Sequence, residues 1–306
     1  MIDIESLTKK FGELTAVDNL TLHVDEGECF GFLGPNGAGK TTTVRMLCCL
    51  ISKTSGTAMI GDYDIGKKAD AQKIRAMIGL LPENAGLYED LSAYRNLDFY
   101  GRLYKVPEGI RRERIEYFLK LLDLWEKRDV TTGTFSKGMK QKLAIARALI
   151  HDPKILFMDE PTAGLDPEAS KMVREFILDL KKEKHTIFLT THNLDEATKI
   201  CDRVGILKTK LIAVGSLDEL SASLTGKKSS VQVDLVTEEI VDAIRNVGFE
   251  KVEVIENENR LNIDVNDPNT DNPGIIDAIV SAGGKIRAIS GVNLSLEDIY
   301  LKLIRS

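Results

Sequence analysis

The chain has few cysteines, no excess of basic residues and no apolar stretch of membrane-spanning length. Its four cysteines fit no zinc-ligand spacing, and we expect them to be reduced in a cytoplasmic protein. The net charge of -6 argues against a nucleic-acid-binding protein, which normally carries a basic field. No run approaches the roughly 20 apolar residues that cross a bilayer, and the N-terminus, Met1-Ile2-Asp3-Ile4-Glu5, has no signal-peptide pattern. These absences leave a globular, cytoplasmic protein as the expectation.

What the chain does contain fits one large folded domain followed by a small one. Its hydrophobic fraction of 43% and charged fraction of 29% are typical of globular proteins, and 306 residues suffice for two cores. The residues Thr225-Gly226-Lys227-Lys228-Ser229-Ser230 read as a linker. We therefore expect domains at residues 1–222 and 229–306.

The residues Gly34-Pro35-Asn36-Gly37-Ala38-Gly39-Lys40-Thr41 match the pattern of a phosphate-binding loop. An apolar run at residues 28–33 precedes them as an expected strand, and residues 42–47 read as the opening of a helix. Glycines let successive N–H groups point at an anion, and the helix N-terminus adds its positive end. Lys40 would reach the β- and γ-phosphates, while the Thr41 hydroxyl would ligate Mg²⁺. An accidental glycine-rich turn is the alternative, but the flanking strand and helix favour a nucleoside triphosphate site.

The rest of the large domain predicts strands around a central parallel sheet and a charged, helical region. Strand-like alternation fills residues 1–33 and returns at 57–60, whereas residues 66–125 are charged and helical, with an amphipathic stretch at 111–122. Beyond that stretch we expect helices at 136–150 and 173–180, and strands at 155–158, 186–190 and 203–207.

The small domain has the expected order strand, helix, strand, strand, helix, strand, which is the ferredoxin-like arrangement. The strands are expected at residues 231–236, 251–255, 260–265 and 285–289, and the helices at 238–246 and 274–281. Ser295 then resembles the N-cap of a last helix over 296–304. This domain carries no motif of its own, so a structural or dimer-forming role and the sensing of a small ligand both remain open.

Two carboxylates follow the expected buried strand at 155–158. Asp159 is placed to hold Mg²⁺, and Glu160 is placed to polarise the water that attacks the γ-phosphate. A strand that ends in solvated acids is the alternative, which the loop at residues 34–41 makes improbable.

A second expected anion site opens the helix at 136–150. Ser136 and Gly138 offer a hydroxyl and unblocked N–H groups at a helix start. Because residues 34–41 already cradle one nucleotide, this second site is best explained if it faces a nucleotide held by another copy of the chain.

In this setting the chain resembles the ATP-binding cassette (ABC) ATPases over roughly residues 1–220. The phosphate loop, Ser136-Lys137-Gly138, Asp159-Glu160, the loop that ends at Asp166, and Thr190-Thr191-His192 occur in the family's order. The resemblance implies an α/β P-loop NTPase fold with a parallel sheet core, an antiparallel β-subdomain and a helical subdomain, followed by the α+β ferredoxin-like domain.

The resemblance also implies roles for individual residues. Glu160 and the switch histidine His192 would be catalytic, and Thr41, Glu83 and Asp159 would hold Mg²⁺. Ser136, Gly138 and Asp166 would act across a dimer interface, and Phe11 would stack on adenine, the alternative being a core aromatic at a strand end. The expected nucleotide-binding residues are Phe11, Gly34, Pro35, Asn36, Gly37, Ala38, Gly39, Lys40, Thr41, Thr42, Ser136, Gly138 and Asp166.

Two motifs depart from the family pattern. The signature normally reads Leu-Ser-Gly-Gly-Gln, and the matched positions here are Phe135, Ser136, Lys137, Gly138 and Met139. Lys137 stands where the signature normally has glycine, and its positive charge is compatible with a nearby phosphate. Glu83 stands where glutamine is usual, and a carboxylate is at least as good an oxygen ligand for Mg²⁺. Both departures and the appended small domain resemble the multidrug-export, daunorubicin-resistance type of subfamily.

The function that follows is an ATP-binding and ATP-hydrolysing subunit of an exporter. The resemblance implies Mg²⁺ as cofactor, a head-to-tail homodimer that closes on ATP, and a separate integral membrane permease that holds the chain at the inner face of the cell membrane. No nucleic-acid partner is expected. Two alternatives are a soluble ABC-class ATPase that acts on ribosomes or DNA, and a nucleotide sensor that does not hydrolyse ATP.

Overall fold

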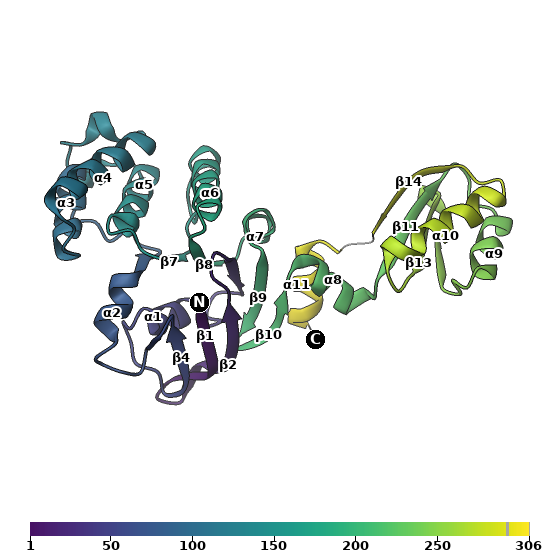
Figure 1. The fold of residues 1–306 in the computed structure, drawn as a ribbon, viewed down its shortest axis with the longest axis horizontal. Coiled ribbons are helices and arrows are strands. Elements are labelled where there is room, and N and C mark those ends of the chain that lie inside the picture. Colours follow the sequence, from purple (N-terminus) through teal and green to yellow (C-terminus); the bar gives the residue numbers. More distant parts are fainter. Residues whose placement is uncertain (292–293, 306) are drawn as a thin grey trace. The chain divides into compact units, whose positions relative to one another are not determined.

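The chain forms two compact units, Met1–Val214 and Gly215–Ser306, in a computed structural model that describes residues 1–291 and 294–305 (Figure 1). The break lies between Val214 and Gly215, whereas the sequence suggested residues 223–228. Helix α8 (Leu217–Thr225) fills much of the expected gap, and β11 begins at Lys228. The predicted linker is therefore reduced to Gly226 and Lys227, because residues on both sides of this pair continue regular elements.

The central sheet of the first unit has the strand order β10-β9-β3-β8-β7-β6. Parallel pairing joins β9 to β3, β3 to β8, β8 to β7 and β7 to β6. The strands are β3 Cys29–Leu33, β6 Ile78–Leu81, β7 Ile155–Asp159, β8 Thr186–Thr191, β9 Arg203–Lys208 and β10 Lys210–Gly215. In a parallel sheet the carboxyl ends of the strands share one edge, so the residues after β3, β7 and β8 are brought together there.

The two faces of this sheet contribute to different apolar cores. Phe30, Phe32, Phe157 and Phe188 pack against one another on one face, with ring centroids 5.3 to 6.4 Å apart. Their neighbours in the strands, such as Leu156, point to the other face and its helices. This alternation is the two-residue period of a strand, and burial on both faces explains the nearly unbroken apolar runs of the sequence.

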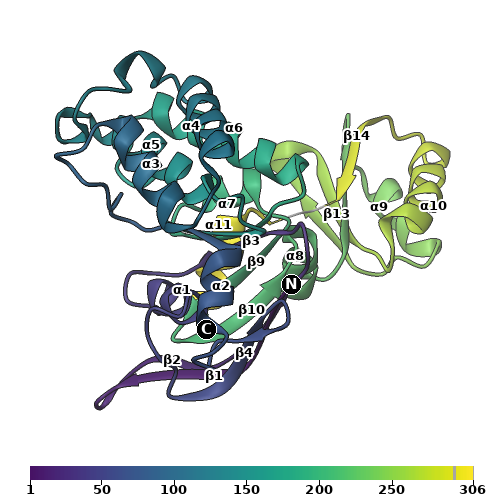
Figure 2. The same ribbon diagram turned by 60° about the vertical axis from the view of Figure 1, so that its left-hand side comes forward.

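An antiparallel sheet of order β2-β1-β4-β5 packs on the phenylalanine face together with helix α1 (Lys40–Leu47). Both views place α1 beside β1, β2 and β4 (Figure 2). The strands are β1 Ile2–Phe11, β2 Leu14–Val24, β4 Ser55–Ile60 and β5 Tyr63–Asp64. The predicted antiparallel subdomain is thus confirmed.

Helices α3, α4 and α5 gather in one helical region of the first unit (Figures 1 and 2). The helices of this part of the chain are α2 Ala71–Met77, α3 Ala93–Leu103, α4 Glu108–Leu121 and α5 Lys137–Leu149. The expectation of a helical 66–125 was wrong at Ile78–Leu81, which is the strand β6. A four-residue apolar run has no readable period, and its pairing with β7 makes it a strand.

Three further elements of the first unit escaped prediction, the short strand β5, helix α7 and strand β10. Helix α7 (Leu194–Ile200) follows β8, with Asn193 as its N-cap, and β10 follows β9 after Thr209 and lies beside it in the sheet. The helix expected at residues 173–180 is longer and runs over Pro167–Lys182 as α6. Asp166 caps its start by accepting a hydrogen bond from the Ala169 N–H. Short single turns cover Trp125–Lys127 and Thr132–Thr134.

The second unit contains the predicted ferredoxin-like sheet, with the antiparallel order β12-β13-β11-β14. Its core includes Val231, Ile244, Leu261 and Ile279. The elements are β11 Lys228–Val233, α9 Glu238–Asn246, β12 Val252–Ile255, β13 Arg260–Asp264, α10 Pro268–Ser281 and β14 Ile286–Gly291, with a single turn at Glu256–Glu258. Helix α11 (Leu296–Arg305) contacts α8. Among the described residues, no helix has both the length and the apolar character needed to cross a membrane.

Candidate functional site

The loop at residues 34–39 connects β3 to α1 and wraps around the Lys40 side chain. The Lys40 ammonium donates to the carbonyl oxygens of Gly34 at 2.7 Å and Pro35 at 3.4 Å, and it is 6% exposed. Gly39 has φ +103°, and a Cβ there would lie 2.3 Å from the Ala16 carbonyl oxygen. The tight curl of the loop therefore depends on glycine at this position.

Asp159, the last residue of β7, lies beneath the loop and is 3% exposed. The Thr41 hydroxyl donates to its Oδ1 at 3.1 Å, and the Thr190 hydroxyl donates to the same oxygen. No cation pairs with this buried carboxylate among the residues described. Hydroxyl and carboxylate oxygens are the ligands that Mg²⁺ prefers, so this part of the site fits that ion.

Glu160 lies between Lys40 and His192. Its Oε1 is 3.4 Å from the Lys40 ammonium, and its Oε2 is 2.9 Å from His192 Nδ1 and 3.3 Å from the His192 backbone N–H. Its φ of +52° is strained for a residue with a side chain, and its N–H donates to the Thr190 carbonyl at 3.0 Å. The strained backbone directs the carboxylate toward the loop at residues 34–39.

These groups border a cavity of about 500 Å³. It is lined by Phe11, Leu14, Ala16, Pro35, Asn36, Gly37, Ala38, Gly39, Lys40, Thr41, Thr42, Glu83, Glu160, Ala163 and His192. Gly34 and Asp159, which are also expected to bind the nucleotide or Mg²⁺, do not line the cavity themselves. They are hydrogen-bonded to two residues that do, Gly34 to Lys40 and Asp159 to Thr41. The structure therefore brings together groups from β1, β2, α1 and the segments that follow β3, β6, β7 and β8.

Phe11 lies at the edge of this cavity and is 49% exposed, so it is not a core aromatic. The Lys9 ammonium lies 4.7 Å from the centroid of its ring. Its open ring is a suitable stacking surface for a planar base.

Ser136, Gly138 and Asp166 do not line the cavity. Ser136 caps α5 by accepting from the Met139 N–H at 3.2 Å, and both Ser136 and Asp166 are exposed. A Cβ on Gly138 would lie 3.3 Å from the Ala169 Cβ, so α5 and α6 run close together there. Within one chain these residues form a separate polar surface at the start of two helices.

Sequence reasoning missed Glu196, a carboxylate that is 2% exposed. Its Oε2 accepts from the hydroxyls of Thr162 at 2.8 Å and Thr191 at 3.3 Å, and burial raises its pKa. It thus joins the segment after Glu160 to the residue before His192. The pattern of an asparagine at 193 and a glutamate three residues later is a helix-start signal, and it predicts α7. It does not predict that the Glu196 side chain is buried.

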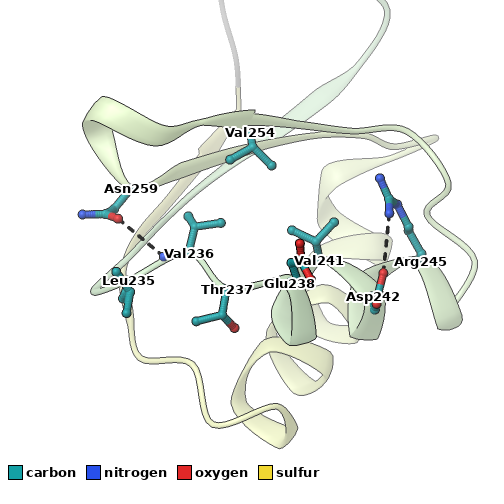
Figure 3. A pocket seen from close by; sticks show the side chains of 9 residues that line it. All are labelled: Leu235, Val236, Thr237, Glu238, Val241, Asp242, Arg245, Val254 and Asn259. Carbon is teal, nitrogen blue, oxygen red and sulfur yellow. Dashed lines mark hydrogen bonds and ion pairs between the residues drawn. The ribbon is translucent and has the colours of Figure 1, made fainter.

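A second cavity, of about 610 Å³, belongs to the second unit. Figure 3 shows Glu238, Asp242 and Arg245 of α9 along it, opposite Val254, with Asp242 and Arg245 paired to each other. It has two carboxylates and lacks a glycine loop, so it does not fit a triphosphate. No sequence motif pointed to it.

Two family models match the chain. The ABC transporter model matches residues 17–163, which include the loop at 34–39 and the acidic pair. The model of the C-terminal domain of DrrA1-3-like ATP-binding proteins matches residues 215–304.

Known proteins match over most of the chain. The linearmycin resistance ATP-binding protein LnrL of Bacillus subtilis (strain 168) is 35% identical over 87% of this chain and 85% of its own length. The daunorubicin resistance ATP-binding protein DrrA3 of Streptomyces coeruleorubidus is 33% identical over 99% of this chain and 95% of its own length. These names give no support to action on ribosomes or DNA, or to a sensor that does not hydrolyse ATP.

Solved structures match over somewhat less than three quarters of the chain. An ATP-binding subunit of an ABC transporter has a TM-score of 0.68 and 29% identity over 74% of this chain and 94% of that chain. A dimeric ATP-binding cassette in a post-hydrolysis state, bound to ADP and Pi, has a TM-score of 0.65 and 28% identity over 71% of this chain and 99% of that chain.

Proposed function

Since this chain belongs to the ABC transporter family, as an ATP-binding subunit of the drug-resistance and export type, we propose that it drives a separate membrane permease by hydrolysing ATP. ATP hydrolysis is the general activity of the family. The observation that carries the proposal is the convergence of Lys40, Glu160 and His192 on one cavity behind a phosphate-type loop. Here the permease would hold the chain at the inner face of the membrane.

The triphosphate would enter along the loop, and its phosphates would replace the carbonyl and carboxylate oxygens that now surround the Lys40 ammonium. Thr41, Asp159 and Glu83 would hold Mg²⁺, which when bound neutralises charge on the β- and γ-phosphates. No group of three or more His, Cys, Asp and Glu side chains in the described part of the chain is placed to hold a metal ion. Phosphate oxygens would therefore supply further ligands, as is usual for Mg²⁺.

Glu160 would act as the general base for hydrolysis. It accepts a proton from water as that water attacks the γ-phosphorus and the bond to the bridging oxygen of ADP breaks. His192 holds one Glu160 oxygen at 2.9 Å, which leaves the other oxygen directed toward the cavity, next to Lys40. The products are ADP and inorganic phosphate.

We assign Ser136, Gly138 and Asp166 to the nucleotide site of a partner copy in a head-to-tail homodimer. None of these residues lines the chain's own cavity, so the polar start of α5 is available to another molecule. A helix N-terminus with an exposed serine hydroxyl suits a γ-phosphate. Closure would then last only while triphosphate links the two chains, because hydrolysis removes the shared contacts.

Mixing two inactive variants tests this arrangement. Ser136→Arg blocks the helix start and Lys40→Ala removes the phosphate contact, so each homodimer should be inactive. A mixed dimer has one intact composite site, and an equal mixture should recover about a quarter of the wild-type phosphate release, since half of the dimers are mixed. If each site were built within one chain, every site in the mixture would carry one of the two substitutions, and no activity would return. An absence of recovery would therefore contradict the head-to-tail arrangement. Mixing wild type with each variant provides the control for exchange of subunits.

The permease would dock on an exposed aromatic patch that consists of Tyr88, Phe99 and Tyr100. Tyr88 and Phe99 are 48% and 42% exposed, and their ring centroids lie 5.0 Å apart. The Tyr100 hydroxyl donates to the Gly86 carbonyl in the segment that carries Glu83. Exposed aromatic side chains that are bonded to the segment carrying Glu83 are expected to be covered by a partner.

Replacement of Phe99 by aspartate is expected to abolish co-purification with the permease from membranes, because a charge cannot be buried in an apolar contact. The matched control is Tyr117→Asp, which alters an exposed aromatic of α4 outside the patch. ATP affinity should equal that of the wild type in both variants. Equal loss of co-purification in the two variants would refute docking at this patch.

A further inference from the structure

Arg147 of α5 is a buried cation that pairs with no carboxylate in the described residues. Its side chain is 9% exposed, and burial lowers its pKa. Its guanidinium donates instead to three backbone carbonyl oxygens, those of Ala85 at 2.7 Å, Gly86 at 2.8 Å and Leu80 at 3.1 Å. Burying a charge in this way is costly, so an apolar side chain would serve better if Arg147 only filled space.

The three carbonyls belong to the end of β6 and to the segment that follows it. Glu83 lies between them in sequence and lines the nucleotide cavity. Gly86 has φ +59°, and a Cβ there would lie 2.8 Å from Arg147 Nη1, so the backbone approaches the guanidinium closely. The planar fork of Arg147 thus determines the path of the chain on both sides of Glu83.

The same guanidinium also contacts the aromatic patch. It lies 5.1 Å from the centroid of the Tyr100 ring, and the Tyr100 hydroxyl donates to the Gly86 carbonyl. Through Arg147, the C-terminal part of helix α5 is joined to α3 and to the segment that carries Glu83. One side chain therefore connects the C-terminal part of α5, the segment that carries Glu83 and the patch.

We propose that Arg147 is a positioning residue that holds Glu83 at the nucleotide cavity and makes α5, the Glu83 segment and Tyr100 move together. The link to Mg²⁺ rests on the proposed function, because that function assigns Glu83 to the metal. A shift of α5 on a partner's nucleotide would then displace Glu83 and the aromatic patch as one body.

The dependence of ATP hydrolysis on Mg²⁺ concentration tests the link to Glu83. Arg147→Lys keeps the charge but cannot reach three carbonyls, and it should raise the half-saturating Mg²⁺ concentration about tenfold, as should Glu83→Ala. The double variant should be no worse than Glu83→Ala alone, because the effect of Arg147 passes through Glu83. Additive effects, or an unchanged Mg²⁺ dependence in Arg147→Lys, would overturn the proposal.

Arg111→Lys is the matched control. Arg111 is also buried in the helical region and donates to the Val106 carbonyl, but it pairs with Asp98 and does not contact the Glu83 segment. Its replacement should lower the melting temperature and leave the Mg²⁺ dependence unchanged. A rise in the half-saturating Mg²⁺ concentration in Arg111→Lys as well would show that general loosening explains the effect.

Amide hydrogen exchange separates this inference from the proposed function. Arg147→Lys should speed exchange at residues 84–87, and Arg111→Lys should not. Faster exchange there in a chain that proves unable to hydrolyse ATP would keep the positioning role and refute the enzymatic assignment. Unchanged exchange at 84–87 would overturn the positioning role whatever the activity.

Discussion

Replacement of Glu160 by glutamine is expected to lower the rate of phosphate release by about 100-fold or more, the usual contribution of a positioned general base. The amide keeps the size of the side chain and a hydrogen bond to His192, but it cannot accept the proton of the attacking water. ATP binding should persist, because Lys40 and the loop at residues 34–39 are unchanged. The dimer should then accumulate in the presence of Mg²⁺ and ATP, as measured by size-exclusion chromatography beside a phosphate-release assay.

Glu168→Gln serves as the control, since Glu168 is an exposed carboxylate in the first turn of α6 and does not line the cavity. It should leave both readouts at wild-type values. Turnover of Glu160→Gln within a few-fold of wild type would remove Glu160 from the role of base. Loss of ATP binding in Glu160→Gln would instead assign the carboxylate to binding.

Replacement of Gly39 by alanine is expected to weaken ATP binding by about 100-fold. The backbone there has φ +103°, and the added Cβ would meet the Ala16 carbonyl oxygen at 2.3 Å. Ala16 is held in the sheet by the pairing of β2, so the loop must change its path. The resulting strain and the lost N–H contacts should weaken the free energy of ATP binding by on the order of 3 kcal/mol. Equilibrium binding of a fluorescent ATP analogue measures the effect.

Two glycine variants provide the comparison. Gly109→Ala, in α4, meets no atom within 4 Å and has an ordinary backbone, so binding should not change and stability should rise slightly. Gly37→Ala has open space but φ +81°, and its effect should be intermediate. Wild-type affinity in Gly39→Ala would show that the nucleotide does not depend on the path of this loop.

Elements with strong local signals were predicted well. The loop at residues 34–39, the start of α5 at Ser136 and the strand that ends at Asp159 depend on glycines, a capping hydroxyl and an apolar run close together in the chain. The ferredoxin-like order of the second unit was confirmed for the same reason, since each of its elements has its own period. The sequence also predicted site roles for residues 34–42, 83, 159, 160 and 192, because the motif that contains each is contiguous. The structure places them in or directly behind the lining of one cavity, and their roles stay predictions.

Elements without a local signal were not predicted. The sequence predicts a helix where the structure has strand β6, because four apolar residues become a strand only when β7 pairs beside them. Ser136, Gly138 and Asp166 differ from this case, because the sequence predicted that they face another copy of the chain, and none of them lines the chain's own cavity.

By itself, the sequence determined the chemistry of this protein: which residues can hold phosphate, which carboxylates follow the strands, and which family pattern they share. The tertiary structure alone decided which of these groups meet, including the pairing of Glu160 with Lys40 and His192, the burial of Glu196 and the three carbonyl bonds of Arg147. The reason is the distance along the chain between the residues that interact. Loop conformations and helix caps depend on residues that are close in the chain. A buried charge depends on partners far away in the chain: Arg147 donates hydrogen bonds to carbonyl oxygens 61 and 67 residues away.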